Sequence, residues 1–187
     1  MRYSNTHREE TRAKLLDQSR AIAKKDGFGT TGIDTLMASI GLSGGAFYRH
    51  FPTKEALFEE LVTREMQHSL EMLAGGDEAS PAHLVKCLRS YLSTRHARSP
   101  DSGCVLPSLG PEIARSSPEL RRKVEDQLTA LKDAWAKRTA NADVAWGLIA
   151  QCVGSVLLAR VVEREGTQRE IVAASRRFLS TALAADI

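Results

Sequence analysis

Apolar residues recur every three or four positions along most of the chain, and no stretch alternates apolar and polar residues long enough to predict a β-strand. This spacing first appears at residues 8–25. A shorter segment follows, with apolar side chains at i, i+3, i+4 and i+7: Ile33, Leu36, Met37 and Ile40. Further helices are expected at about 43–51, 53–74, 84–92, 104–114, 118–135, 143–163 and 167–184. The pattern therefore predicts an all-α fold with about nine helices.

Capping residues indicate where the first four helices begin. Thr31 and Ser43 are the expected N-caps of the second and third helices, and Thr53 is the expected N-cap of the long fourth helix. Pro52 breaks the chain just before Thr53. We divide the chain at this break into a three-helix head, residues 1–53, and a helical body, residues 54–187.

The segment 144–162 is apolar almost throughout, and its length is close to the roughly 20 residues of a membrane span. Small residues within it, among them Ala150 and Gly154, favour close helix packing instead. No second segment of this kind exists in the sequence, so we expect a buried or interface helix and no membrane partner. The last helix is expected to turn four residues inward: Ile171, Ala174, Phe178 and Ala182.

Composition and charge narrow the class of protein. Hydrophobic residues make up 42% and charged residues 26% of the chain, as in globular proteins. The net charge is +3, and residues 1–55 carry nine Lys/Arg against six Asp/Glu, so the excess lies in the first third. A basic head suits the phosphate backbone of DNA. The three cysteines form no CxxC pair, so we expect no metal, no cofactor and no disulfide framework. The polar N-terminus resembles no signal peptide, which indicates a cytoplasmic protein.

The segment 27–58 carries the functional signal. Two short helices are joined by a tight Gly-Leu-Ser turn, and the second opens with a capping position and two glycines. This layout is that of a helix-turn-helix, in which the second helix enters the major groove of DNA. The aromatic rings of Phe47 and Phe51 lie on one face and anchor that helix to its own core, which leaves Tyr48, Arg49 and His50 to face DNA.

The same segment resembles the DNA-binding head of the TetR family of bacterial transcriptional regulators. The resemblance covers about residues 8–60 and is carried by many fixed positions: Gly27-Phe28, Thr30-Thr31, Ile33-Asp34, Gly41-Leu42-Ser43, Gly45, Phe47-Tyr48-Arg49-His50-Phe51 and Lys54-Glu55-Ala56-Leu57-Phe58. It implies the following DNA-binding residues: Thr31, Ser43, Gly45, Ala46, Tyr48, Arg49, His50 and Lys54. The chain departs from the family at Gly44, where a longer side chain is common, and at Gly32, where a small hydroxyl residue or Val is common.

The resemblance also implies the partners and the function. The chain is expected to be a non-enzymatic repressor that binds a palindromic double-stranded DNA operator as a homodimer and leaves it when a small-molecule inducer of unknown identity binds the body. Candidate pocket residues are Tyr91, Cys104, Leu106, Trp135 and Trp146, and candidate dimer-interface residues are Ala150, Gly154, Leu157 and Phe178. In the dimer, the last two helices would form a four-helix bundle with their copies.

Three alternatives stay open. The protein is a DNA-binding regulator without small-molecule input, or it senses oxidants or electrophiles through Cys104, or it is a thiol enzyme that uses Cys104 with His83 or His96. The sensor hypothesis expects an accessible Cys104 at a helix N-terminus, since that position favours the reactive thiolate.

Overall fold

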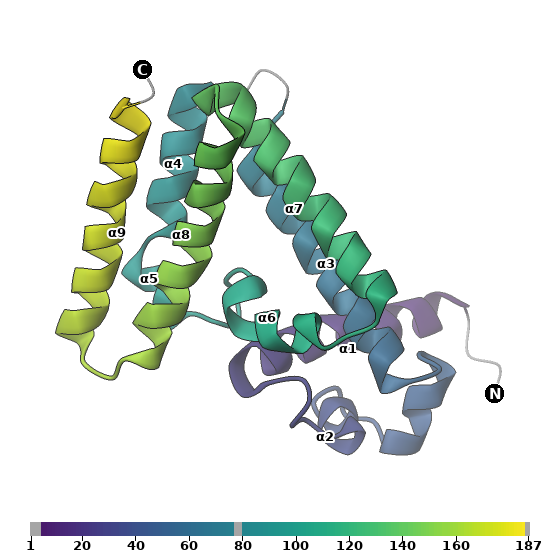
Figure 1. Cartoon of the computed structure of the whole chain (residues 1–187). Helices are drawn as coiled ribbons and strands as arrows, with labels where there is room; N and C mark the ends of the chain where they lie inside the picture. Colours follow the sequence, from purple (N-terminus) through teal and green to yellow (C-terminus); the bar gives the residue numbers. More distant parts are fainter. Residues whose placement is uncertain (1–4, 77–79, 186–187) are drawn as a thin grey trace.

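The computed structural model describes residues 5–76 and 80–185, and within them the chain forms nine α-helices, one 3-10 helix and no strand (Figure 1). The all-α expectation is confirmed. The elements are α1 (Asn5–Asp26), α2 (Ile33–Ala38), η1 (Gly44–Arg49), α3 (Lys54–Ala74), α4 (Pro81–Tyr91), α5 (Thr94–Arg98), α6 (Leu106–Ala114), α7 (Pro118–Thr139), α8 (Ala142–Val161) and α9 (Glu165–Ala185). The short helix α5 is one that the hydrophobic spacing does not predict.

The head is built from α1, α2, η1 and the start of α3 (Figure 1). Phe47 and Phe51 are buried at its centre, as their spacing predicts, and they pack in one cluster with apolar residues of α1 and α2. Thr53 caps α3, because its hydroxyl accepts a 3.1 Å hydrogen bond from the backbone N–H of Ala56.

The apolar core of the head continues into the body without a break. The same buried cluster holds Leu61 and Met66 of α3, Leu109 and Ile113 of α6, and Val124 of α7. Helix α6 crosses between the head and the long helices of the body (Figure 1). The division at residues 53 and 54 therefore does not coincide with a gap in packing, and it stays a prediction about function.

The body has a second core under α8. Helices α7 and α9 both pack on α8, and α4 packs on α7. Trp135 is buried there, and its indole N–H donates a 3.0 Å hydrogen bond to the carbonyl of Leu73. Among the described residues only α8 is long and apolar enough to cross a membrane, and 39% of its apolar window is buried inside the chain.

Two local expectations, for Thr31 and Cys104, are corrected, and a third, for Ser43, is confirmed in part. Thr31 does not cap α2: Gly32 holds that position, and the Thr31 hydroxyl donates to the carbonyl of Gly27 at 2.7 Å. Ser43 holds the N-cap position of η1 but makes no side-chain capping hydrogen bond. Cys104 lies two residues before α6, whose N-cap is Val105, so it does not begin a helix.

The inward face of α9 also differs from the expectation. Val172, Ser175 and Leu179 are its buried residues, whereas Phe178 and Ala174 are exposed. Ile171 is half-buried, and the side chain of Ala182 lies outside the described residues. Ser175 lies on the buried face instead, where its hydroxyl accepts a 2.6 Å hydrogen bond from Ser155 of α8. A polar pair turns the helix by about one position from the face that hydropathy alone selects.

Candidate nucleic-acid interface and effector cavity

The recognition segment is a short 3-10 helix held close to α2. Gly41 lets the chain turn at a φ of +75°, a conformation that disfavours other residues. At Gly44 an added Cβ would lie 1.8 Å from the Asp34 carboxylate oxygen, so a larger side chain would displace Asp34. The Asp34 side chain thus occupies the space beside η1 that a longer residue at position 44 would need.

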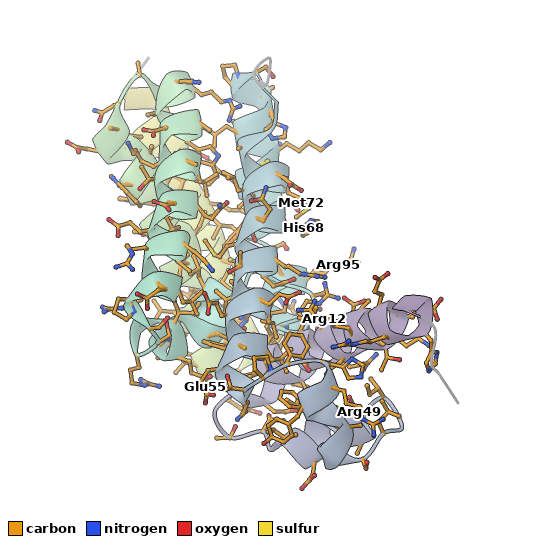
Figure 2. All side chains as sticks on the ribbon, turned by 90° about the vertical axis from the view of Figure 1, so that its right-hand side faces the viewer. Arg12, Arg49, Glu55, His68, Met72 and Arg95 are labelled. Carbon is orange, nitrogen blue, oxygen red and sulfur yellow. The ribbon has the colours of Figure 1, made fainter. Side chains whose placement is uncertain are left out.

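The predicted DNA-binding residues fall into three groups by solvent exposure. Tyr48 is 63% exposed, and Ser43, Gly45 and Arg49 are exposed beside it. Ala46, His50 and Lys54 are half-buried, whereas Thr31 is buried. Figure 2 shows Arg49 at the edge of the head, with Arg12 of α1 nearby. The exposed group forms one edge, and Thr31 supports the turn behind it.

A basic hollow of about 390 Å³ flanks this edge, lined by His7, Arg8, Thr11, Leu42, Ala46, Arg49 and His50. The guanidinium of Arg8 donates a 2.8 Å hydrogen bond to the carbonyl of Arg49, which ties α1 to the end of η1. The pKa of His50 is lowered from 6.5, first by partial burial and then by the charges of Arg8, Arg12 and Arg49. A phosphate placed in this hollow would oppose that lowering, because a negative charge favours the protonated imidazole.

Lys54 is positioned by the head itself. Its ammonium donates a 3.3 Å hydrogen bond to the carbonyl of Gly29 and lies 4.7 Å from the centre of the Phe28 ring. These contacts hold the charge at the start of α3, where the free N–H groups of a helix N-terminus also favour an anion.

Two polar contacts join the head to the region around α6. The Glu112 carboxylate of α6 accepts 3.1 Å hydrogen bonds from the backbone N–H groups of both Phe28 and Gly29. The buried ammonium of Lys24 donates to Glu65 at 2.6 Å and to the carbonyl of Gly103 at 2.8 Å. A shift of α6 or of the loop before it therefore moves groups that are hydrogen-bonded to the head.

The body encloses a small apolar cavity of about 30 Å³. Of the predicted pocket residues, Tyr91, Cys104 and Leu106 line it. Trp135 is buried in the core but does not line this cavity, and Trp146 is 42% exposed on the outer side of α8. The volume is far below the roughly 300 Å³ of an ordinary ligand pocket, so a ligand would have to widen it.

The surroundings of Cys104 oppose a reactive thiolate. Burial raises the pKa of this thiol, and the weaker influences of Tyr91, the backbone near Leu106, Lys24 and Arg160 lower it only in part. Burial likewise raises the pKa of Cys152 to about 12. The backbone N–H of Cys104 donates to Nε2 of His96 at 2.8 Å, so this ring nitrogen accepts a hydrogen bond and does not act as a base toward the thiol. The backbone at the start of α6 does favour the thiolate, but burial outweighs it, so the expectation of a lowered pKa at Cys104 is wrong.

An apolar face remains uncovered on α8 and α9. Its exposed large side chains are Trp146, Leu157, Leu158, Val161 and Phe178. Ala150 is exposed among them, and an added Cβ at Gly154 would meet nothing within 4 Å. The four predicted interface residues thus all lie on or beside this face.

Comparisons with known proteins agree with this architecture. The profile described as "Bacterial regulatory proteins, tetR family" matches residues 15–61. An uncharacterised helix-turn-helix transcriptional regulator of Lactococcus lactis subsp. lactis is 25% identical over 168 residues, which cover 82% of this chain and 85% of that protein. The chain belongs to the TetR family of transcriptional regulators.

Two further proteins are similar to this chain, one in the sequence of a single region and one in the fold of almost the whole chain. The regulator UidR of Escherichia coli K12 is 29% identical over 65 residues, 35% of this chain and 33% of UidR. The crystal structure of a TetR regulator from Chloroflexus aurantiacus superposes with a TM-score of 0.72 at 22% identity, covering 94% of this chain and 96% of that one. The TetR fold therefore spans both the head and the body, and the apolar helix α8 belongs to the core of that fold.

Membership of the TetR family confirms a DNA-binding, non-enzymatic regulator, which excludes the thiol-enzyme alternative. Sequence reasoning missed three residues that connect the head to the body, Lys24, Glu65 and Glu112, and one that lines the cavity, Gln127. One signal was present for Lys24, which adjoins Ala23 on the apolar face of the first helix. No local pattern marks Glu112, because its partners lie more than 80 residues away.

Proposed function

We propose that this TetR-family protein is a cytoplasmic homodimeric repressor that leaves a palindromic operator when a small molecule enters its body. The observation that carries the proposal is the physical connection between head and cavity. Leu106 and Cys104 line the cavity, while Glu112 of the same helix α6 and the neighbouring Gly103 are hydrogen-bonded to the head. A molecule that widens the cavity therefore acts on contacts that fix the orientation of the head.

In this proposal the exposed edge of the head reads DNA. Arg49 contacts a base edge in the major groove, and Tyr48, His50 and Lys54 hold phosphates. Ser43, Gly45 and Ala46 allow the backbone to approach DNA closely. Thr31 contributes by fixing the turn that presents Lys54 and Gly29, since its own hydroxyl is occupied by Gly27.

The dimer in this proposal forms through α8 and α9. The uncovered apolar face would pair with its copy about a twofold axis, and the two heads would then meet successive major grooves about 34 Å apart. The operator is accordingly a near-palindrome.

Fluorescence anisotropy with an operator fragment selected from a random library tests the proposal. Arg49→Ala is expected to relax the preference at one operator position, at a cost of about 1–3 kcal/mol. Lys54→Ala is expected to weaken binding to all sequences and to reduce the salt slope by about one unit. Lys137→Ala removes an exposed cation at the far end of α7 and is expected to change neither.

Two results would oppose the proposal. An unaltered sequence preference in Arg49→Ala would move base reading to another residue. A protein that binds its operator tightly, but releases it for no compound that binds the body, would favour regulation without small-molecule input.

A further inference from the structure

The wall of the body cavity carries no charged side chain. It is formed by α3, α4, α6, α7, α8 and the residue Cys104, and its lining contains no Asp, Glu, Lys, Arg or His. The nearby cations are already engaged. Arg160 donates to the carbonyl of Ala97 at 3.1 Å and to the hydroxyl of Ser108 at 2.7 Å, and Lys24 is held by Glu65 and Gly103.

Two polar atoms of the lining residues are buried without a hydrogen-bond partner: the hydroxyl of Tyr91 and the side-chain oxygen of Gln127. Tyr91 as a whole is 8% exposed, so its hydroxyl faces the interior of the body and not bulk solvent. Buried polar groups in folded proteins are hydrogen-bonded almost without exception, so this pair needs an explanation. The neighbour of the Tyr91 hydroxyl is the thiol of Cys104, which is a weak partner.

Whether each atom donates or accepts a hydrogen bond defines which ligand the two atoms fit. Burial raises the pKa of Tyr91 well above its usual value, and the neighbouring Cys104 raises it further, so the phenol is neutral and donates a hydrogen bond. The Gln127 oxygen accepts one. A hydroxyl group both accepts and donates, so a ligand hydroxyl matches the hydrogen-bonding capacity of both atoms. A carboxylate or phosphate would lose its hydration here and find no cation in return.

The size and softness of the wall add a second restriction. A cavity of about 30 Å³ holds little more than a water molecule, so an occupant must displace side chains. Met66, Leu70, Leu73 and Leu128 line it, and their unbranched or flexible ends yield more easily than the backbone does. A compact molecule needs the smallest displacement, and its apolar part replaces contacts among these side chains.

We propose that the cavity takes a compact, uncharged, mainly apolar molecule with one hydroxyl group, of the phenol class, whose hydroxyl accepts from Tyr91 and donates to Gln127. The inference rests on the proposed function, because it assigns the chemistry of the inducer to the same cavity. It excludes anionic inducers such as aromatic or sugar carboxylates from this site.

Calorimetric titration of the full-length protein with phenol, toluene and benzoate tests the assignment at neutral pH. Phenol is expected to bind, toluene to bind about 5- to 10-fold more weakly for want of the hydrogen bonds, and benzoate not to bind. Tyr91→Phe is expected to bind phenol more weakly than the wild type does, because one of the two hydrogen bonds is lost, with its toluene affinity unchanged. Gln127→Leu is expected to lower phenol affinity in the same selective way.

Gln67→Leu is the matched control for Gln127→Leu, since it removes an exposed side-chain amide of α3 that does not line the cavity, and it is expected to leave phenol affinity unchanged. The assignment is overturned if benzoate binds as tightly as phenol, if none of the three compounds binds, or if Tyr91→Phe binds phenol like the wild type. Operator anisotropy in the same samples separates the two proposals. Phenol binding without operator release contradicts the proposed function and leaves the ligand class standing.

Discussion

The ammonium of Lys24 and the carboxylate of Glu65 form an ion pair at 2.6 Å inside the protein, with 1% and 12% of their side chains exposed. The pair joins α1 of the head to α3, at the level where the loop before α6 also meets the head. A charge buried in this way destabilises the fold when its partner is removed, because it keeps its desolvation cost and loses its attraction. The pair therefore fixes the position of α1 more strictly than apolar packing alone does.

Removal of the lysine is expected to leave an uncompensated carboxylate. Lys24→Met should lower the free energy of unfolding by about 3 kcal/mol, although Arg20, at 3.5 Å from Glu65, compensates in part. The double variant Lys24→Met/Glu65→Met should recover most of this loss. Urea denaturation of the three proteins measures both effects.

The exposed pair Lys123–Glu59 provides the control, because it has the same 2.6 Å separation but 52% and 35% exposed side chains. Lys123→Met is expected to cost less than about 1 kcal/mol. Equal losses in Lys24→Met and Lys123→Met would mean that burial contributes nothing to the inner pair.

The contact of Glu112 with the head gives a second prediction. Glu112→Gln keeps the size of the side chain but turns an amide NH₂ toward one of the two backbone N–H groups of Phe28 and Gly29. We expect a loss of about 1–2 kcal/mol in stability and faster hydrogen exchange at these two amides. Glu125→Gln, at an exposed position of α7, is the control. Unchanged exchange in Glu112→Gln would show that the head is held by packing alone.

His96 predicts a pH dependence of stability. Its pKa is lowered from 6.5, first by burial and then by Arg160 and Lys24, against an opposing hydrogen bond to the carbonyl of Tyr91. Because the folded state resists protonation, the unfolded state binds more protons below pH 6.5. The contribution of His96 to the free energy of unfolding is fully present above pH 6.5. It is lost as the pH decreases through the lowered pKa of the folded state.

Glutamine is the matched replacement for His96, since it stays neutral and its oxygen can accept the hydrogen bond from the Cys104 backbone N–H in place of Nε2. Urea denaturation of both proteins between pH 8 and pH 5 measures the difference, in which the other titrating groups cancel. The wild type should lose stability relative to His96→Gln only on the acidic side. Parallel curves over the whole range would refute the assignment.

The proposed dimer gives a fourth prediction. Leu158→Glu, at a position 57% exposed in one chain, should convert the protein to monomers in sedimentation velocity and reduce operator affinity by about 100-fold or more, because two linked heads bind together. Met72→Glu places the same charge at a 58% exposed apolar residue of α3, outside the uncovered face, and should leave the dimer intact (Figure 2). A dimeric Leu158→Glu would place the interface elsewhere.

Hydrophobic periodicity predicted the long helices well, because each of them buries one continuous stripe. In α7 the apolar spacing selects Leu120, Val124, Leu128, Leu131 and Trp135, of which all are buried except Leu128, which is half-buried. The method fails where polar contacts decide the orientation. Ser175 and not Phe178 faces inward on α9, since Ser155 supplies a hydroxyl partner that no periodicity records.

The exposed edge of the head was predictable because its residues lie close together in the chain. The cavity and its connection to the head were not. Gln127, Tyr91 and Cys104 come from three different elements, and their juxtaposition depends on how α4, α7 and the loop before α6 pack. Trp146 illustrates the same limit: aromatic character suggested a pocket residue, and only the packing of α8 shows that the ring points outward.

The bond between Gly103 and Cys104 has a mechanical consequence. A peptide unit is planar and rotates as one rigid body. The carbonyl of this unit is held by Lys24 of the head, its N–H is held by His96 of the body, and the side chain that follows lines the cavity. An added Cβ at Gly103 would lie 2.6 Å from the His96 ring, so the unit has little room to turn. A rotation of this peptide unit forced by an occupant of the cavity must break its hydrogen bond to Lys24 or to His96. This peptide unit is therefore the most direct connection between an occupant and the head.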